Sequence, residues 1–133
     1  HRALCQQLQH HGADLPGRAD DGAMLAIGSP GADRITTALM QVLTAHCLEG
    51  AALQDAINAP RVHIGVDFAT RDLSIETEPD EALEAAARQI DAPVRTHSRH
   101  AMYFGGVGAA KRKADGDLEA AADPRRASAT AIG

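Results

Sequence analysis

The stretch Gly-Ser-Pro-Gly-Ala-Asp-Arg at residues 28–34 has the residue types best suited to chemistry. It follows an apolar run and precedes a helical pattern, so successive backbone N–H groups should gather at a helix start, with the helix dipole behind them. Such a loop can bind a phosphate, a carboxylate or the transient oxyanion of an acyl transfer, or it can be a turn without a ligand. Phosphate is disfavoured, because Ala32, Asp33 and Arg34 stand where a P-loop has Lys and Ser or Thr.

Other reactive side chains lack suitable neighbours in the sequence. The histidines at residues 10–11 and the pair His97 and His100 have no Glu or Cys at metal-ligand spacing, so we predict no metal site and no cofactor. Ser29 is not surrounded by the G-x-S-x-G pattern of a nucleophile elbow. The basic run at residues 111–113 precedes an expected turn and is explained by a solvated strand end.

Composition limits the remaining function classes. The 133 residues suffice for one modest domain, and aromatic residues make up only 2%, so small aliphatic side chains must form the core. A formal net charge of −5 argues against nucleic-acid binding. Cys5 and Cys47 form no CxxC pair, which leaves a disulfide between them open. No apolar stretch approaches the roughly 20 residues of a membrane helix, so no membrane span is predicted.

The loop is positioned by a strand and a helix. We expect residues 1–20 to be a peripheral segment and residues 21–133 to form the main body. Residues 23–27 predict a short strand covered on both faces. Apolar residues then recur at steps of three and four from Arg34, which predicts an amphipathic helix that Asp33 caps and Gly50 ends. The apolar stripe consists of Ile35, Leu39, Val42, Leu43 and Cys47.

The rest of the chain mixes helices and strands without a regular βαβ alternation. Two further helices are expected, at residues 51–58 and, after Pro79, at residues 80–90, the second with Leu83, Ala87 and Ile90 on its inner face. The expected strands lie within residues 61–64, 72–76, 94–97, 102–113 and 117–122, with a hairpin turn at residues 115–116.

Five blocks in this order resemble the C-terminal part of the small subunit of the γ-glutamyltransferases, also called γ-glutamyltranspeptidases. The blocks are GSPGADRITTALMQVL at 28–43, AINAPRVH at 56–63, LSIE at 73–76, MYFGGVGA at 102–109 and LEAAADPRR at 118–126. No block is decisive alone, but their ordered combination is specific.

The resemblance implies an α+β fold, namely part of the αββα sandwich of N-terminal nucleophile hydrolases, with a mostly antiparallel sheet and helices on its faces. In that family a precursor cleaves itself into two subunits, and the N-terminal Thr of the small subunit attacks a γ-glutamyl amide such as that of glutathione. The acyl-enzyme is then passed to water or to an amino acid. The family's two oxyanion-binding backbone amides match Gly31 and Ala32, while Gly28, Pro30 and Asp33 shape the loop.

The chain departs from the family pattern in three places. Ala32 replaces a Gly, the Ser pair that binds the substrate's α-carboxylate has no match before Ser29, and the Thr nucleophile has no match either. Thr36 and Thr37 lie inside the expected helix and cannot replace it. We therefore expect no substrate-binding side chain in this chain, and no activity from the chain alone.

The expected partners are the remainder of the precursor, meaning the large subunit and the N-terminal part of the small subunit, and a small γ-glutamyl substrate. A sandwich interrupted partway exposes strand edges and apolar faces, which favours association. Two alternatives remain: an inactive truncated member that acts only in association, and an acylase that acts on another acyl amide. The sequence does not fix the compartment; by resemblance, bacterial relatives are often periplasmic or extracellular.

Overall fold

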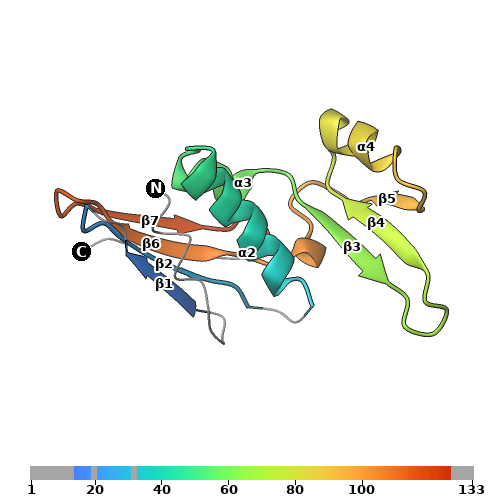
Figure 1. The fold of residues 1–133 in the computed structure, drawn as a ribbon, viewed down its shortest axis with the longest axis horizontal. Helices are drawn as coiled ribbons and strands as arrows, with labels where there is room; N and C mark the ends of the chain where they lie inside the picture. The colour runs from blue at the N-terminus through green and yellow to red at the C-terminus, as the bar shows by residue number, and fades with distance from the viewer. Residues whose placement is uncertain (1–13, 19–20, 31–32, 127–133) are drawn as a thin grey trace.

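The computed structural model describes residues 14–18, 21–30 and 33–126, which form two sheets side by side with helices on them (Figure 1). The larger sheet has the strand order β1-β2-β6-β7 and is antiparallel throughout. The smaller sheet has the order β3-β4-β5, with β4 antiparallel to β3 and parallel to β5. The larger sheet comprises β1 (Asp14–Arg18), β2 (Met24–Gly28), β6 (Gly108–Arg112) and β7 (Leu118–Ala122). The smaller sheet comprises β3 (Val62–Val66), β4 (Leu73–Thr77) and β5 (Val94–Thr96).

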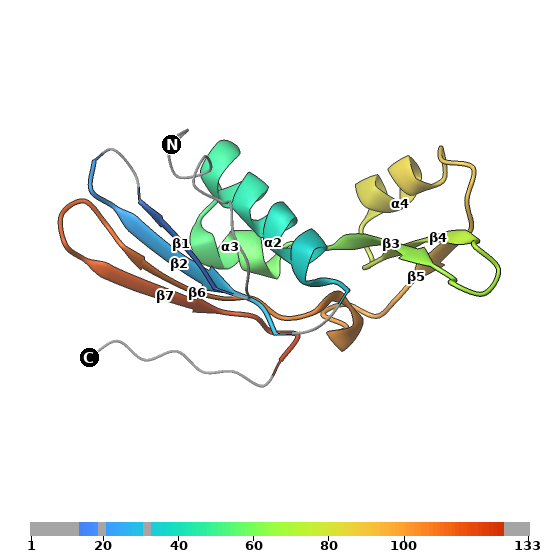
Figure 2. The ribbon, with the colours of Figure 1, turned by 60° about the horizontal axis from the view of Figure 1, so that its bottom comes forward.

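The helices cover one face of each sheet. Figure 2 shows α2 (Ile35–Leu43) and α3 (Leu53–Asn58) over the larger sheet, and α4 (Glu81–Ala87) over the smaller one. The helix α2 continues into a π-helical turn, η1 (Thr44–Leu48), and a 3₁₀ turn, η2 (Met102–Phe104), precedes β6. None of these described helices is long and apolar enough to cross a membrane.

The main core lies between the larger sheet and the pair α2 and α3. Apolar side chains recur at steps of three and four along α2 and at alternate positions along β2, so both elements present one face to this core. Its buried members are Leu25, Ile27, Ala38, Leu39, Val42, Leu43, Cys47, Leu53, Ala56, Ile57, Val107 and Ala121. The expected stripe of the first helix is therefore confirmed. Cys5 lies outside the described residues, so the structure does not address its pairing with Cys47.

The two faces of strand β2 differ in their surroundings. Leu25 and Ile27 are buried against the helices, whereas Met24 and Ala26 are exposed. Because side chains alternate along a strand, these two residues lie on the opposite face of the sheet. Within the described chain no second layer covers that face, so the expectation that residues 23–27 are covered on both faces stays a prediction.

The start of α2 differs from the prediction. Its N-cap residue is Arg34, which already has helical dihedral angles, and no side chain caps the first amides. Asp33 lies one residue further out and is exposed, so the expected cap by Asp33 is not formed. The helix gains its stability from the buried stripe instead.

The proposed boundary between residues 1–20 and 21–133 stays a prediction. Within the first segment, β1 forms the edge strand of the larger sheet and pairs with β2 from Asp14 opposite Gly28 to Arg18 opposite Met24. The remaining residues of that segment lie outside the described chain.

The smaller sheet is joined to α2 and carries α4. The Gln41 side-chain amide donates to the Val62 carbonyl and its oxygen accepts from the Val62 N–H, at 2.9 and 3.0 Å. This pairing satisfies both backbone groups of Val62 at the free edge of β3. The Asp80 carboxylate caps α4 by accepting from the Leu83 N–H at 2.9 Å. The helix ends before Ile90, which is exposed, so that residue does not join the predicted inner face.

The core predicts a clear contrast between two truncations. Ile57→Ala should lower the free energy of unfolding by about 2–5 kcal/mol, because a fully buried side chain is replaced by a cavity. Leu48→Ala, at an exposed position of η1, is the matched control and should change it by less than about 0.5 kcal/mol. Urea unfolding followed by circular dichroism measures both. Equal losses from the two variants would contradict this assignment of the core.

Candidate active site

The loop of interest connects β2 to α2, and its two ends are described while its centre is not. Gly28 is the last residue of β2 and pairs with Gly108 of β6. Ser29 and Pro30 follow, and Asp33 and Arg34 lead into α2. Gly31 and Ala32, whose amides are the expected oxyanion donors, lie outside the described residues, so their role stays a prediction.

The first end of the loop packs against the segment that follows η2. Ser29 is buried, and Gly105 lies beside it: a Cβ added to Gly105 would come within 3.7 Å of the Ser29 hydroxyl oxygen. That distance is ordinary contact, so space alone does not require a glycine. The backbone does, because Gly105 has a φ of +76°, where an L side chain is strained. Gly105 thus lets the chain turn beneath the start of the loop.

The second end of the loop rests on a stack of flat side chains. The Arg34 guanidinium lies 3.9 Å from the centre of the Tyr103 ring. The His97 ring stacks on Tyr103 with their centres 4.3 Å apart and their planes 19° apart. A guanidinium over an aromatic face is attracted by the ring's electron density. The turn η2 and the glycine that follows it therefore contact both ends of the loop: Gly105 lies against Ser29, and Tyr103 lies against Arg34.

The Glu76 carboxylate, which also bonds to Ser74, holds the His97 ring of this stack in place. Glu76 is buried and accepts from His97 Nε2 at 2.5 Å and from the Ser74 hydroxyl at 2.9 Å. Burial alone would raise the pKa of the Glu76 carboxyl, but these hydrogen bonds and the charge of Arg95 outweigh it and hold the pKa below its usual range. Glu76 therefore stays ionised and fixes the His97 ring.

His63 lies at the edge of the same stack. Its ring meets Tyr103 edge-on with centres 6.3 Å apart, and its Nδ1 lies 3.0 Å from the Thr37 hydroxyl in a hydrogen bond. Burial, and next the positive charge of Arg34, lower the pKa of His63 despite the opposing charges of Glu76 and Asp33. The imidazole is therefore held neutral at neutral pH, beside the fixed charge of Arg34.

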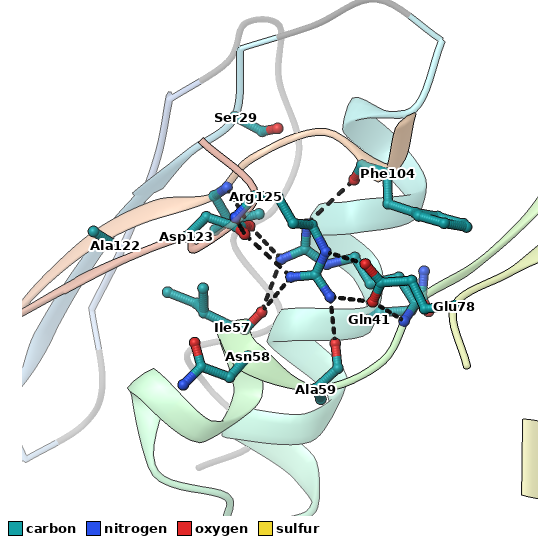
Figure 3. A network of polar contacts seen from close by, with 12 residues as sticks. Ser29, Gln41, Ile57, Asn58, Ala59, Glu78, Phe104, Ala122, Asp123 and Arg125 are labelled. Carbon is teal, nitrogen blue, oxygen red and sulfur yellow. Dashed lines mark hydrogen bonds and ion pairs between the residues drawn. The ribbon is translucent and has the colours of Figure 1, made fainter. Parts of the chain in front are cut away.

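Four charged side chains behind η2 form a buried cluster, which we call the charge cluster: Arg61, Glu78, Asp123 and Arg125. Each is at most 2% exposed. Figure 3 shows Glu78, which follows β4, meeting Asp123 and Arg125, which both lie in the segment after β7. Arg125 donates to both Glu78 carboxylate oxygens and, at 3.1 Å, to Asp123, while Arg61 donates to Asp123 at 2.7 Å. Two positive and two negative charges cancel within the cluster.

The charge cluster also completes the end of α3. The Ile57 carbonyl accepts from Arg61 at 3.1 Å and from Arg125 at 2.9 Å, and the Ala59 carbonyl accepts from Arg125 at 2.8 Å. The last carbonyls of a helix have no partners within it, and cations are favoured at this end. The guanidinium groups supply both the hydrogen bonds and the charge.

The same cluster holds the segment that supports the loop. Arg61 donates to the Phe104 carbonyl at 3.2 Å, and the Val107 N–H donates to Asp123 at 2.8 Å. These bonds fasten both sides of Gly105, which lies against Ser29. A continuous set of contacts therefore runs from the charge cluster through residues 103–107 to the two ends of the loop.

Sequence reasoning placed the five blocks but missed this cluster. A signal for it is present: every member stands within one residue of a proline, in Pro60-Arg61, Glu78-Pro79 and Asp123-Pro124-Arg125. Proline marks the end of a helix or strand. The sequence does not show that these three ends meet.

The expected absence of a metal site stays a prediction, because the histidines at residues 10–11 lie outside the described residues. His97 is hydrogen-bonded to Glu76. Among the described residues, no group of three or more His, Cys, Asp or Glu side chains could hold a metal ion.

The structure has two sheets, each with helices on one face, and a loop that connects strand β2 to helix α2. This arrangement matches the fold of the N-terminal nucleophile hydrolases. The family model for gamma-glutamyltranspeptidase matches residues 18–133. The chain belongs to the gamma-glutamyltranspeptidase family.

Individual relatives agree with this assignment. The chain is 30% identical over 116 residues to the oxamate amidohydrolase proenzyme of Klebsiella pneumoniae. The matched region is 86% of this chain and 22% of that protein. A solved structure of the transpeptidase CapD of Bacillus anthracis superposes with a TM-score of 0.69 at 23% identity, covering 98% of this chain and 78% of CapD. Gamma-glutamyltranspeptidase from Pseudomonas nitroreducens, complexed with L-DON, gives 0.69 at 21% identity, with coverage of 96% and 66%.

The charge cluster generates a stability prediction. Arg125→Met should lower the free energy of unfolding by about 3–5 kcal/mol, because it leaves buried carboxylates without their partner. Arg88→Met is the matched control: its ion pair with Glu84 on α4 is exposed on the arginine side, and its loss should cost less than about 1 kcal/mol. Urea unfolding measures both. A loss below 1 kcal/mol for Arg125→Met would show that the cluster does not hold the fold together.

Proposed function

We propose that this chain supplies the oxyanion loop of a longer enzyme that cleaves amides through an acyl-enzyme, in the manner of the γ-glutamyltransferases. The observation that carries the proposal is the support of the loop at both ends, through Ser29 against Gly105 and Arg34 over Tyr103. A loop fixed in this way can present backbone amides in one direction, which is what oxyanion stabilisation requires. Family membership over residues 18–133 gives this geometry its chemical meaning.

In the proposed reaction, a Thr hydroxyl from the remainder of the protein attacks the amide carbonyl. The carbonyl oxygen becomes an oxyanion, and the N–H groups of Gly31 and Ala32 donate to it. The C–N bond then breaks, the amine leaves with a proton, and the acyl group stays on the Thr oxygen. Water or an amino acid attacks this ester, releases the acyl product and restores the hydroxyl.

The acyl group has two candidate identities. A γ-glutamyl amide is the substrate that the family suggests. The 30% identical relative is named an oxamate amidohydrolase, which favours a second candidate, namely hydrolysis of another acyl amide. γ-Glutamyl, glutaryl and oxalyl groups, the last being the acyl part of oxamate, share one feature, a carboxylate on the acyl part. Comparing the turnover of a γ-glutamyl anilide, a glutaryl anilide and oxamate by the full-length gene product distinguishes them.

The oxyanion role predicts the effect of removing one amide. In the full-length gene product, Ala32→Pro should lower kcat by about 10²–10³-fold, because proline has no N–H to donate. Ala32→Gly is the matched control, since it keeps the N–H, and its kcat should stay within about 3-fold. Turnover of the preferred amide measures both, and the chain alone should show none. Unchanged kcat in a correctly self-cleaved Ala32→Pro enzyme would refute the role.

We also propose that the remainder of the gene product covers the exposed face of the larger sheet. Ala26 of β2 pairs with Ala110 of β6, and both are exposed on the face opposite the helices. Gly28 and Gly108, the next pair on that face, are also small. Small side chains leave a flat surface on which a second sheet can pack closely. The match spans 22% of the relative's length, so a gene product of that length would have ample polypeptide to form that layer.

Association can be tested with a charge on this face. Ala110→Glu should abolish co-purification of the chain with the separately produced remainder, because a carboxylate buried between sheets lacks a partner. The matched control is Ala85→Glu on the exposed side of α4, which should bind as the unchanged chain does. Circular dichroism checks that both variants fold. Full retention of binding by a folded Ala110→Glu would place the interface elsewhere.

A further inference from the structure

Arg34 differs from the other positioned arginines near the loop. Arg61 and Arg125 are each paired with buried carboxylates. Within the described part of the chain, no carboxylate lies within ion-pairing distance of Arg34; its guanidinium instead lies over Tyr103 at 3.9 Å. A cation therefore stands at the end of the candidate oxyanion loop, and no described carboxylate pairs with it.

The position of this cation leaves its hydrogen bonds available. A ring stacked against a guanidinium contacts its flat face, whereas carboxylates bind along its edge, where the N–H groups point. Stacking and carboxylate binding are therefore compatible. The Nε atom of Arg34 is buried, and none of the described residues accepts a hydrogen bond from it. A donor left without an acceptor costs free energy, which an added acceptor near the guanidinium would offset in part.

The cation is also held in place before any ligand arrives. Tyr103 is fixed by His97, which stacks on it, and His97 is fixed by the buried carboxylate of Glu76. Holding a long side chain in one geometry in advance lowers the entropy cost of binding. The series Glu76, His97, Tyr103 and Arg34 therefore presents one oriented positive charge beside the loop.

Neighbouring charges do not cancel or replace this cation. Glu76 is already engaged by His97 and by Ser74. His63 is neutral, since burial and the charge of Arg34 lower its pKa. Asp33 is exposed and makes no ion pair with Arg34 within the described chain. An anion that approached the loop would meet Arg34 as the available charge.

We propose that Arg34 binds the carboxylate on the acyl part of the substrate, with Tyr103 as the residue that positions it. This inference rests on the proposed function, because it assumes that an acyl group occupies the neighbouring loop. It also supplies a carboxylate-binding group that the sequence lacked, since no Ser pair precedes Ser29.

The test compares two substrates of the full-length gene product: the preferred acyl anilide and the same anilide with its acyl carboxylate converted to a primary amide. Arg34→Gln should lower kcat/KM for the carboxylate substrate by about 10–100-fold, the range for a hydrogen bond to a charged group. The amide substrate should change by less than about 3-fold. Equal changes for both substrates, or none, would overturn the proposal.

Three further variants sharpen the comparison. Arg34→Lys keeps the charge but loses the planar fork, so it should restore part of the discrimination. Tyr103→Leu removes the ring on which the Arg34 guanidinium lies, so it should lose discrimination through a raised KM. Arg88→Gln, at the exposed end of α4, is the matched control and should discriminate between the two substrates as the unchanged enzyme does. Loss of discrimination in the control would overturn the assignment to Arg34.

A carboxylate from the remainder of the protein could satisfy the same chemistry, and the experiment separates the two sources. If Arg34 pairs within the protein, Arg34→Gln should impair self-cleavage or thermal stability and should lower both substrates equally, which overturns the proposal. Failure of the proposed function is also distinguishable. An enzyme that cleaves itself but turns over no amide contradicts acyl transfer, and Arg34 is then tested by calorimetry with glutarate. Binding that Arg34→Gln abolishes supports the proposal, and absence of binding by the unchanged enzyme overturns it.

Discussion

The buried charge cluster is the interaction on which the rest of the structure depends. Arg61, Glu78, Asp123 and Arg125 come from the start of β3, the end of β4 and the segment after β7, so their pairing joins the two sheets. Burying charges is costly, and the cluster tolerates it because the four charges cancel and backbone groups satisfy the remaining hydrogen bonds. In a chain with 2% aromatic residues, small aliphatic side chains form the main core, which lies on the larger sheet. The charges join that core to the smaller sheet.

This arrangement explains how the two described ends of the loop between β2 and α2 are held. The cluster binds the backbone at Phe104 and Val107, and Gly105 between them lies against Ser29. Tyr103 in the same turn lies beneath Arg34. Residues 103–105 therefore contact both described ends of the loop. Sites that are held by surrounding contacts in this way are suited to electrostatic stabilisation, since they need no reorganisation during the reaction.

Sequence patterns predicted the elements more successfully than their surroundings. Periodicity located α2, α3 and most of the strands because each buries one face, and the Asp-Gly turn predicted the final hairpin correctly. Two predictions were wrong: β1 was not expected as a strand, and residues 102–104, expected in a strand, form the 3₁₀ turn η2. The strand at residues 23–27 is covered on one face within the described chain, since an apolar run does not reveal which layer covers the other face. The cap by Asp33 was wrong because the helix begins one residue later than the pattern indicated. The stacking of His97 on Tyr103 could not be predicted, because no local sequence pattern shows that these two side chains meet.

The central claim is that the loop between β2 and α2 directs backbone amides at the reacting carbonyl. The most direct measurement is a crystal structure of the full-length, self-cleaved protein trapped as its acyl-enzyme. The account predicts that the acyl oxygen lies about 2.7–3.1 Å from the backbone nitrogens of Gly31 and Ala32. An acyl oxygen directed away from these nitrogens, or bound by groups outside the loop, would contradict it.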